Sequence, residues 1–177
     1  MTDLLPRLSG GIVLRRLAVT DLANFQSYRH DPELGRFQGW VATPDEEARK
    51  FLSYMNQAAL LQPGTWCQIG IADTSLELIG DIGLILSSDA QQADIGFTLR
   101  RQSQGLGLAT AAVKEAIALV FESCKATKVV GIADTRNVSS IHLLERVGMH
   151  KMETRSTRSR GKWCTEVVYN ARRRDVV

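Results

Sequence analysis

The chain has 177 residues, of which 44% are hydrophobic and 23% charged, and its formal net charge is +3. This composition is typical of a globular protein, and it excludes a membrane-spanning chain because no apolar run approaches the roughly 20 residues that cross a bilayer. The charge is too small to indicate nucleic-acid binding, and the N-terminus lacks the charged-then-apolar pattern of a secretory signal, so we expect a cytoplasmic protein with no membrane or direct nucleic-acid partner.

The cysteines and histidines show no pattern of a metal site. The three cysteines, Cys67, Cys124 and Cys164, form no CxxC pair, and the three histidines lack the spacing of metal ligands. An odd number of scattered cysteines also argues against a disulfide framework and favours a reducing compartment. We therefore predict no bound metal.

The first half of the chain predicts a strand, two helices and then three strands. Residues 12–17 indicate a short strand, and residues 22–28 indicate a short helix. Thr43 is expected to cap a second helix, with Pro44 at the first helical position and Glu46 completing a capping box. Strand-like segments follow at 66–72, 78–86 and 93–99, and the short gaps between them indicate an antiparallel meander.

The second half predicts a long helix, a buried strand, a second helix that ends at Gly148, and a hairpin. The second helix is expected to bury Ile141, Leu144 and Val147. The predicted bounds are 107–122 for the long helix, 128–134 for the strand, 139–147 for the second helix, and 149–157 with 163–171 for the hairpin. We expect one α/β (α+β) domain over residues 1–177, with a core from about 12 to 171 and a mixed, mostly antiparallel sheet flanked by helices.

The most informative segment runs from Gln102 to Ala109, between a predicted strand and a long helix. Its two glycines, Gly105 and Gly107, let the backbone approach a ligand and turn several N–H groups the same way. The N-terminus of the helix adds unpaired donors and a partial positive charge. These features together predict a phosphate-binding turn.

Two other phosphate motifs fit this segment less well. A P-loop needs Gly-Lys-Ser/Thr, which does not follow here. The dinucleotide fingerprint needs a third glycine where Thr110 stands, and it opens directly after its strand, whereas residues 100–104 intervene here. Asp134 does lie at a plausible distance for a ribose-binding acid.

The segment resembles the GNAT superfamily of acetyltransferases, whose phosphate motif is Gln/Arg-x-x-Gly-x-Gly/Ala. The stretch from Gln102 to Gly107 fits that motif at every position. The chain also resembles the RimJ/RimL branch, which carries Asn-x-x-Ser before a helix that ends in Gly-Phe. Here these residues are Asn137 and Ser140, followed by Gly148-Met149, with Met in place of Phe. The resemblance extends from about Ile12 to Tyr169.

The resemblance implies acetyl-coenzyme A (acetyl-CoA) as co-substrate and a direct transfer of its acetyl group to a primary amine. It places the pyrophosphate on the turn and the pantetheine arm along the free edge of the preceding strand. Asn137 would approach the arm, although an asparagine before a helix is equally a cap. The implied cofactor-binding residues are Phe97, Thr98, Leu99, Gln104, Gly105, Leu106, Gly107, Leu108, Ala109, Thr110 and Asn137.

The catalytic groups are less clearly marked in the sequence. Many GNAT enzymes have a proton-donating Tyr where this chain has Leu144, so Ser140 is the best substitute because its hydroxyl can relay a proton. A backbone N–H near Phe97 can stabilise the oxyanion. Asp94 is the first candidate for the general base and Glu166 the second.

The acceptor is predicted to be a protein or peptide N-terminus, since an α-amine with a pKa near 8 needs less help from a base than a lysine amine. An aminoglycoside acetyltransferase, or a non-catalytic acyl-CoA-binding module, remains an alternative. The acceptor pocket is expected around Arg29, His30, Phe37 and Trp40, and the chain is expected to be a monomer or homodimer. The acids available for a polycation are Asp31, Glu33, Asp81, Asp94 and Glu166.

The last 27 residues are rich in basic side chains, which suits either a solvated hairpin and tail or a basic rim that faces an anionic ligand or an acidic partner. These residues are Lys151, Arg155, Arg158, Arg160, Lys162, Arg172, Arg173 and Arg174.

Overall fold

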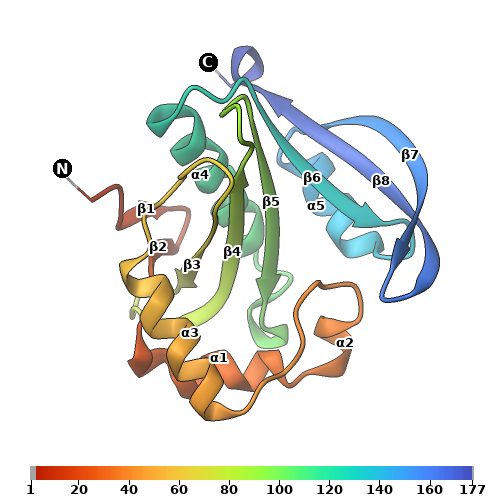
Figure 1. Ribbon diagram of the computed structural model, residues 1–177. Helices are drawn as coiled ribbons and strands as arrows, with labels where there is room; N and C mark the ends of the chain where they lie inside the picture. The colour runs from red at the N-terminus through yellow and green to blue at the C-terminus, as the bar shows by residue number, and fades with distance from the viewer. Residues whose placement is uncertain (1–2, 177) are drawn as a thin grey trace.

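A computed structural model describes residues 3–176, and its strands form one eight-stranded sheet in the order β1-β2-β3-β4-β5-β6-β8-β7 (Figure 1). Neighbouring strands are antiparallel except β5 and β6, which are parallel. This confirms the predicted mixed, mostly antiparallel sheet. The strands are β1 (Arg7–Ser9), β2 (Ile12–Arg16), β3 (Trp66–Ala72), β4 (Leu78–Leu86), β5 (Gln92–Leu99), β6 (Lys128–Asp134), β7 (His150–Ser159) and β8 (Lys162–Arg172).

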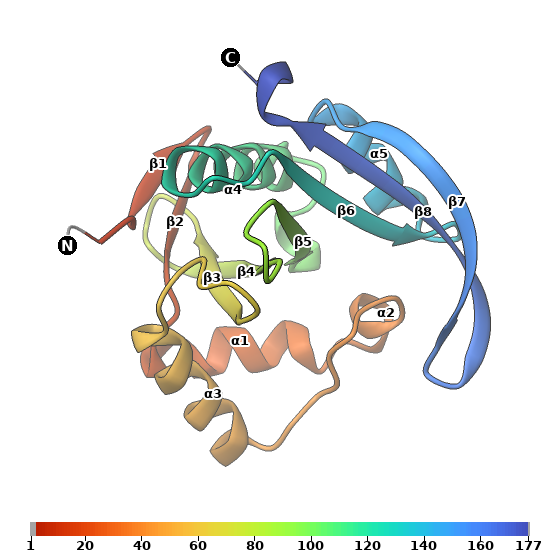
Figure 2. The ribbon, with the colours of Figure 1, turned by 45° about the horizontal axis from the view of Figure 1, so that its top comes forward.

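Helices cover both faces of the sheet (Figure 2). One face carries α1 (Leu22–Arg29), α2 (Pro32–Gly35) and α3 (Asp45–Gln57), and the other carries α4 (Leu108–Ser123) and α5 (Val138–Arg146). The larger part of the core lies under α4, which buries Val113, Ile117 and Val120 as its apolar periodicity predicts. None of the helices within residues 3–176 is long and apolar enough to cross a membrane.

The predicted capping box of α3 is wrong. The helix begins at Asp45, Pro44 occupies the cap position with extended backbone, and no side chain caps the first turn. The carbonyl oxygen of Thr43 instead accepts a hydrogen bond of 2.8 Å from Gln26 of α1. Tertiary contact therefore fixes Thr43, and the acidic first turn of α3 stabilises the helix dipole in place of a cap.

The C-terminal end of α3 depends on a residue that is distant in sequence. The Arg16 guanidinium donates to the carbonyl oxygens of Asn56 and Ala58, at 3.0 and 2.8 Å. Because the last carbonyls of a helix have no partner within the helix, this arginine satisfies groups that would otherwise need water.

Helix α5 packs closely on β6. A Cβ built on Gly131 would lie 2.5 Å from the Leu144 side chain, so only glycine permits this approach. Leu143 and Leu144 are buried, whereas the predicted Ile141 and Val147 are only partly buried. The inward face of α5 is therefore rotated slightly from the one that the sequence predicts.

Two short elements, β1 and α2, escaped the sequence analysis because three or four residues are too few to show a period. The pairing of β5 with β6 is more important for function. It extends only from Gln92 to Ile95 on β5, so the two strands separate beyond Gly96 (Figure 1). The end of β5 consequently has an edge that β6 leaves unpaired.

Candidate active site

A cleft of about 790 Å³ lies where β5 and β6 separate. Its walls come from α2 and the loop after it, the end of β5, the turn before α4, and the first turns of α5. The structure thus brings together the two sequence motifs, which are about 30 residues apart in the chain. The predicted residues that line the cleft are Phe97, Thr98, Leu99, Gln104, Gly105, Gly107, Leu108, Ala109, Thr110, Asn137 and Ser140.

The turn before α4 has the backbone of an anion site. Gly105 and Gly107 have φ angles of 75° and 77°, a region that strongly favours glycine. A Cβ at either glycine would meet no heavy atom within 4 Å, so the space in front of the turn is open. The N–H groups of the first turn of α4 have no partner within the helix and carry its positive dipole end. The turn therefore fits the phosphates of coenzyme A.

A buried hydroxyl supports the same fit. Thr110 Oγ is buried and has no hydrogen-bond partner among the described residues, although it belongs to a residue that lines the cleft. A buried polar group without a partner costs about 1–3 kcal/mol. A phosphate oxygen in the cleft would satisfy this hydroxyl.

The free edge of β5 carries two side-chain amides. Gln38 Nε2 donates to the carbonyl oxygen of Phe97 at 3.1 Å, and Gln104 Nε2 donates to that of Leu99 at 2.9 Å. These carbonyls therefore lie on the edge that β6 leaves unpaired, and each already accepts one side-chain amide. An extended amide-containing ligand can bind such an edge as an added strand does.

The second motif opens α5. Asn137 is the N-cap residue, and its Oδ1 accepts from the Ser140 backbone N–H at 3.3 Å. The cap therefore uses the backbone of Ser140 and leaves its hydroxyl available. Because both residues also line the cleft, the structural and functional interpretations of Asn137 are compatible.

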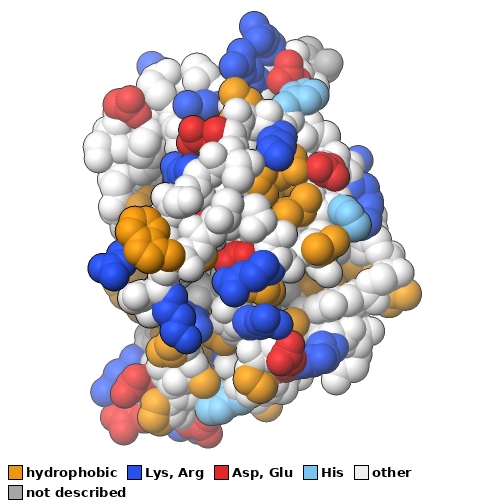
Figure 3. All heavy atoms as spheres, turned by 90° about the vertical axis from the view of Figure 1, so that its right-hand side faces the viewer, with side chains coloured by type: hydrophobic (Ala, Val, Ile, Leu, Met, Phe, Trp, Pro, Cys, Tyr) orange, Lys and Arg blue, Asp and Glu red, His pale blue; other side chains and the backbone are white. Residues whose placement is uncertain are grey.

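The charges around the cleft favour an anion. Arg101, Arg136 and Arg146 line it, against one carboxylate, Glu33. Figure 3 views the side of the molecule that carries α5 and the β7–β8 hairpin, and it shows basic side chains, with some acidic ones between them, around apolar ones in the middle of that face. Coenzyme A, with its phosphates, matches this balance of charge.

Two of these arginines also form ion pairs. Arg101 binds Asp31 at 2.5 Å, and its hydrogen bond lowers the pKa of that carboxyl to about 2. Arg136 binds Asp134 at 2.7 Å, and its hydrogen bond holds the pKa of Asp134 below the usual value. Both carboxylates therefore stay ionised at neutral pH and fix the arginines at the rim of the cleft.

Three predicted residues lie outside the set that lines the cleft. Asp94 points to the α1 side of the sheet and accepts a 2.6 Å hydrogen bond from Gln92 Nε2. Glu166, on β8, pairs with Arg155 at 3.4 Å. The Leu106 side chain is 68% exposed, so any contact of this residue with the cofactor would come from its backbone.

Of the four residues expected around the acceptor, Phe37 lines the cleft. Arg29 is buried and paired with Asp81 at 2.8 Å, and Trp40 stacks on the Arg29 guanidinium at 4.4 Å. His30 is exposed, with Nε2 3.2 Å from the Thr43 carbonyl oxygen. Arg29 and Trp40 thus support the wall of the cleft from behind.

Sequence reasoning missed several cleft residues. His142 and Arg146 lie one helical turn apart on α5, so helical spacing from Ser139 could have found them. Leu34 and Gln38 gave no comparable signal, because the irregular segment around α2 has no period, whereas Glu33, expected among the acids near the pocket, does line the cleft. They reach the cleft only through the tertiary fold.

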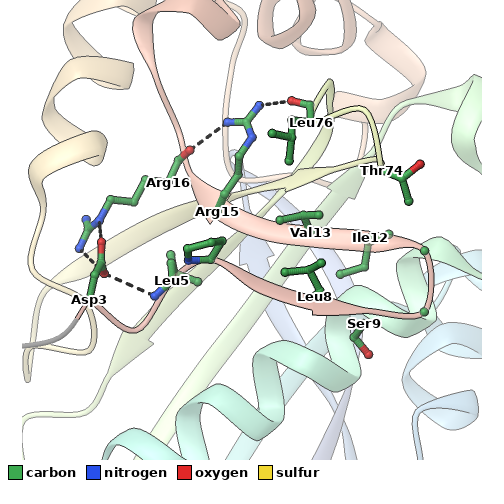
Figure 4. A pocket seen from close by; sticks show the side chains of 13 residues that line it. Asp3, Leu5, Leu8, Ser9, Ile12, Val13, Arg15, Arg16, Thr74 and Leu76 are labelled. Carbon is green, nitrogen blue, oxygen red and sulfur yellow. Dashed lines mark hydrogen bonds and ion pairs between the residues drawn. The ribbon is translucent and has the colours of Figure 1, made fainter.

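A second hollow, of about 760 Å³, lies along the β1–β2 hairpin (Figure 4). Its lining is mainly apolar, and its charged side chains pair with one another or with nearby groups. Arg16 binds Asp3, and Arg15 binds Asp21 and the Leu76 carbonyl oxygen. No chemistry is assigned to this hollow, because its charges are already used in holding the hairpin.

Comparison with known proteins identifies the family. The model of the acetyltransferase (GNAT) domain matches residues 12–150, which is most of the chain. The chain belongs to the GNAT acetyltransferase family. It is therefore an N-acetyltransferase that uses acetyl-CoA. A GNAT relative, the uncharacterized N-acetyltransferase p20 of Bacillus licheniformis, is 26% identical over 142 residues, covering 79% of each chain.

Solved structures share this GNAT fold. A GNAT acetyltransferase from Bacillus anthracis matches with a TM-score of 0.84 at 15% identity, over 96% of this chain and 99% of that one. The ribosomal L7/L12 α-N-protein acetyltransferase RimL, in complex with coenzyme A, matches at 0.78 and 15%, over 94% and 96%. The spermidine N-acetyltransferase of Vibrio cholerae, in complex with CoA and spermine, matches at 0.77 and 15%, over 94% and 98%. At such identities the likeness shows the fold alone.

Proposed function

We propose that this enzyme acetylates the α-amino group of a protein or peptide N-terminus, in the manner of the RimJ/RimL branch. The observation that carries the proposal is the single cleft that joins the phosphate turn to Asn137 and Ser140. Among the fold neighbours, RimL is named for an α-N-protein activity and another for spermidine, so the fold is compatible with either acceptor.

The state of the carboxylates favours an N-terminus over a polycation. Of the five acids available for an aminoglycoside or polyamine, three are in ion pairs: Asp31 with Arg101, Asp81 with Arg29, and Glu166 with Arg155. Asp94 keeps its charge, because its partner Gln92 is neutral, but it lies outside the set that lines the cleft. Of these five acids only Glu33 lines the cleft, beside Arg146 and two arginines that are already paired with Asp31 and Asp134. A pocket for a polycation would need several unpaired carboxylates.

The pKa of the acceptor amine also favours an N-terminus. An α-amine has a pKa near 8, so roughly a tenth of it is neutral at pH 7, whereas a lysine amine near 10.4 is neutral in well under about 1% of molecules. Acetyl-CoA supplies an activated acetyl thioester. An enzyme whose cleft offers only Glu33 and His142 as proton acceptors among its described lining residues is better suited to the amine that loses its proton more readily.

In this proposal some residues of the chain bind acetyl-CoA and others transfer protons. The turn from Gln104 to Thr110 holds the phosphates, and the edge of β5 from Phe97 to Leu99 aligns the arm. The Ser140 hydroxyl, at the opposite wall, relays a proton to the departing thiolate: it donates its own proton and takes one from water at the same time. Asp94 lies on the other side of β5, the side of α1, and accepts the proton of the amine from there.

A second candidate function, a non-catalytic acyl-CoA-binding module, is favoured by the leucine at the position of the usual tyrosine. It predicts binding without turnover. Formation of an acetylated product by the unmodified protein separates the two. For an enzyme, Asp94→Asn then tests the base: it should lower kcat, with a loss that shrinks as the pH rises and the amine deprotonates by itself. A pH-independent loss, or none, would remove Asp94 from the mechanism.

The function is tested by binding and by product analysis. Acetyl-CoA at about 100 times its dissociation constant should stabilise the fold by roughly 2.7 kcal/mol in a thermal shift assay, with NAD and ATP as controls. Mass spectrometry should then show acetylated peptide N-termini from a panel that also contains polyamines and aminoglycosides. Acetylation of the polycations alone would reject the proposed acceptor and leave the assignment of the enzyme class intact.

A further inference from the structure

The tip of the β7–β8 hairpin is hydrogen-bonded to the loop that lines one side of the cleft. Arg160 Nη2 lies 3.3 Å from the carbonyl oxygen of Gly35, 2.5 Å from that of Gln38 and 2.9 Å from that of Trp40. The hairpin and the loop are more than 100 residues apart in sequence, so nothing local brings them together. We call residues 35–40 the wall segment.

The wall segment is also attached to the sheet. Gln38 Nε2 donates to the Phe97 carbonyl oxygen at 3.1 Å, and Trp40 Nε1 donates to Thr98 Oγ at 3.3 Å. Trp40 stacks on the buried Arg29 guanidinium. The wall segment therefore reaches from the hairpin to the free edge of β5, and the hydrogen bonds of Arg160 attach it to the hairpin.

The position of the wall segment relates it to the acceptor. The phosphate turn occupies one end of the cleft, and an arm laid along β5 would run from there towards Phe97, where Gln38 is bound. An amine that approaches the reacting end must therefore pass beside the wall segment. Phe37 and Gln38 both line the cleft at this point.

We propose that Arg160 is a positioning residue that fastens the wall segment to the β7–β8 hairpin and so sets the entry of the acceptor amine. This inference rests on the proposed acceptor function. Arg160 reaches only backbone carbonyls of the wall segment and no residue of the phosphate turn. Its loss should therefore loosen the entry and weaken amine binding, with little effect on cofactor affinity or on the chemical step.

The hairpin contains a matched control. Arg158, two residues away, is also exposed, but its guanidinium stacks on the Trp163 ring at 5.5 Å and does not contact the wall segment. Arg158→Gln removes one positive charge from the same hairpin and leaves the hydrogen bonds of Arg160 to the wall segment in place. Arg160→Lys keeps the charge and offers a compact ammonium in place of the planar guanidinium.

The first readout needs no activity. Arg36 is exposed and lies inside the wall segment, so trypsin can cleave the bond between Arg36 and Phe37 when the segment opens. Mass spectrometry of native digests should show this bond cleaved at least about tenfold faster in Arg160→Gln, which corresponds to about 1.4 kcal/mol of opening free energy. The cleavage rate of Arg160→Lys should lie between those of Arg160→Gln and the unmodified protein. The rate of Arg158→Gln should match that of the unmodified protein.

The second readout is steady-state kinetics with acetyl-CoA and a serine-initiated hexapeptide with a free N-terminus. For Arg160→Gln we expect the peptide KM to rise about tenfold with kcat within about twofold, and calorimetric acetyl-CoA affinity to stay within about twofold. Equal cleavage of Arg160→Gln and Arg158→Gln would overturn the proposal, as would a lower kcat at unchanged KM. If the unmodified enzyme fails to acetylate the peptide, the proposed acceptor is wrong, and the proteolysis alone decides the role of Arg160.

Discussion

At the scale of single residues, a substitution at Ser140 distinguishes a catalytic role of its hydroxyl from a structural one. Its backbone N–H, not its hydroxyl, takes part in the α5 cap, so Ser140→Ala leaves the cap in place. We expect kcat to fall about 100-fold, the low end of the 10²- to 10⁴-fold range of general acid catalysis, because thiolate is already a fair leaving group. Acetyl-CoA affinity and melting temperature should barely change.

The control for this variant is Ser53→Ala, which removes an exposed hydroxyl from α3, away from the cleft. Turnover, calorimetric affinity and thermal denaturation are measured on all three proteins. Normal turnover in Ser140→Ala would leave water as the proton donor.

Thr110 offers a prediction in which two effects have opposite signs. Its buried hydroxyl has no partner in the protein, so the isosteric change Thr110→Val should leave the free protein as stable as before or up to about 1 kcal/mol more stable. With cofactor present the hydroxyl can donate to a phosphate oxygen, a hydrogen bond to a charged group worth about 1.5–3 kcal/mol.

The variant should therefore bind acetyl-CoA roughly 10- to 100-fold more weakly while unfolding at the same or a higher temperature. Calorimetry and thermal denaturation test both parts. A loss of stability together with unchanged affinity would show that the hydroxyl serves the fold and not the ligand.

At the scale of the elements, part of the basic C-terminus is structural. Arg173 donates to the carbonyl oxygens of Phe121, Cys124 and Ala126, at and beyond the end of α4, and its guanidinium stacks on the Phe121 ring at 5.2 Å. Two of the eight basic residues of this region, Arg160 and Arg173, thus bind backbone carbonyls instead of facing a ligand or partner.

Arg173→Met should destabilise the protein by about 1–3 kcal/mol, because the helix-end carbonyls lose charged donors. The neighbouring Arg174 is 74% exposed and provides the control Arg174→Met, for which we expect a change within about 0.5 kcal/mol. Urea denaturation measures both free energies of unfolding. Equal effects would mean that the contacts of Arg173 add nothing to the packing of α4.

At the scale of the whole molecule, the ion pair between Asp31 and Arg101 joins the α1–α3 side to the turn that precedes α4. The folded pKa of Asp31 is about 2, against 3.8 for the unperturbed carboxyl. Since the folded value is the lower one, the stabilisation is fully present above about pH 4 and is lost as the pH falls to 2. Arg101 is 55% exposed, so water screens the pair and its contribution to stability is small.

Asp31→Asn should reduce the free energy of unfolding at pH 7 slightly and flatten the fall of stability between pH 4 and 2. In the unmodified protein the Asp31 side chain caps α2 by accepting hydrogen bonds from the first N–H groups of that helix. The amide oxygen of asparagine can accept the same bonds, so the comparison isolates the effect of the charge. Chemical denaturation across this pH range is the measurement. An unchanged acid profile would show that Arg101 does not hold Asp31 in solution.

The sequence by itself determined the parts of this protein that depend on neighbours in the chain. Period-2 and period-3.6 patterns located the central strands and α4, and the glycine spacing at Gly105 and Gly107 located the phosphate turn, because backbone conformation there depends on local sterics. The capping box at Thr43 failed for the opposite reason, since contact with α1 overrode a local preference.

Only the tertiary structure decided how distant segments meet. The separation of β5 from β6, the wall segment held by Arg160, and two of the ion pairs depend on residues far apart in the chain. Arg29 and Asp81 are 52 positions apart, Arg101 and Asp31 are 70 apart, and Arg160 and Gly35 are 125 apart. Periodicity carries no information on such contacts, because they follow from the packing of helices on the two faces of the sheet. For the same reason the co-substrate could be inferred from a local motif, whereas the acceptor side of the cleft could not.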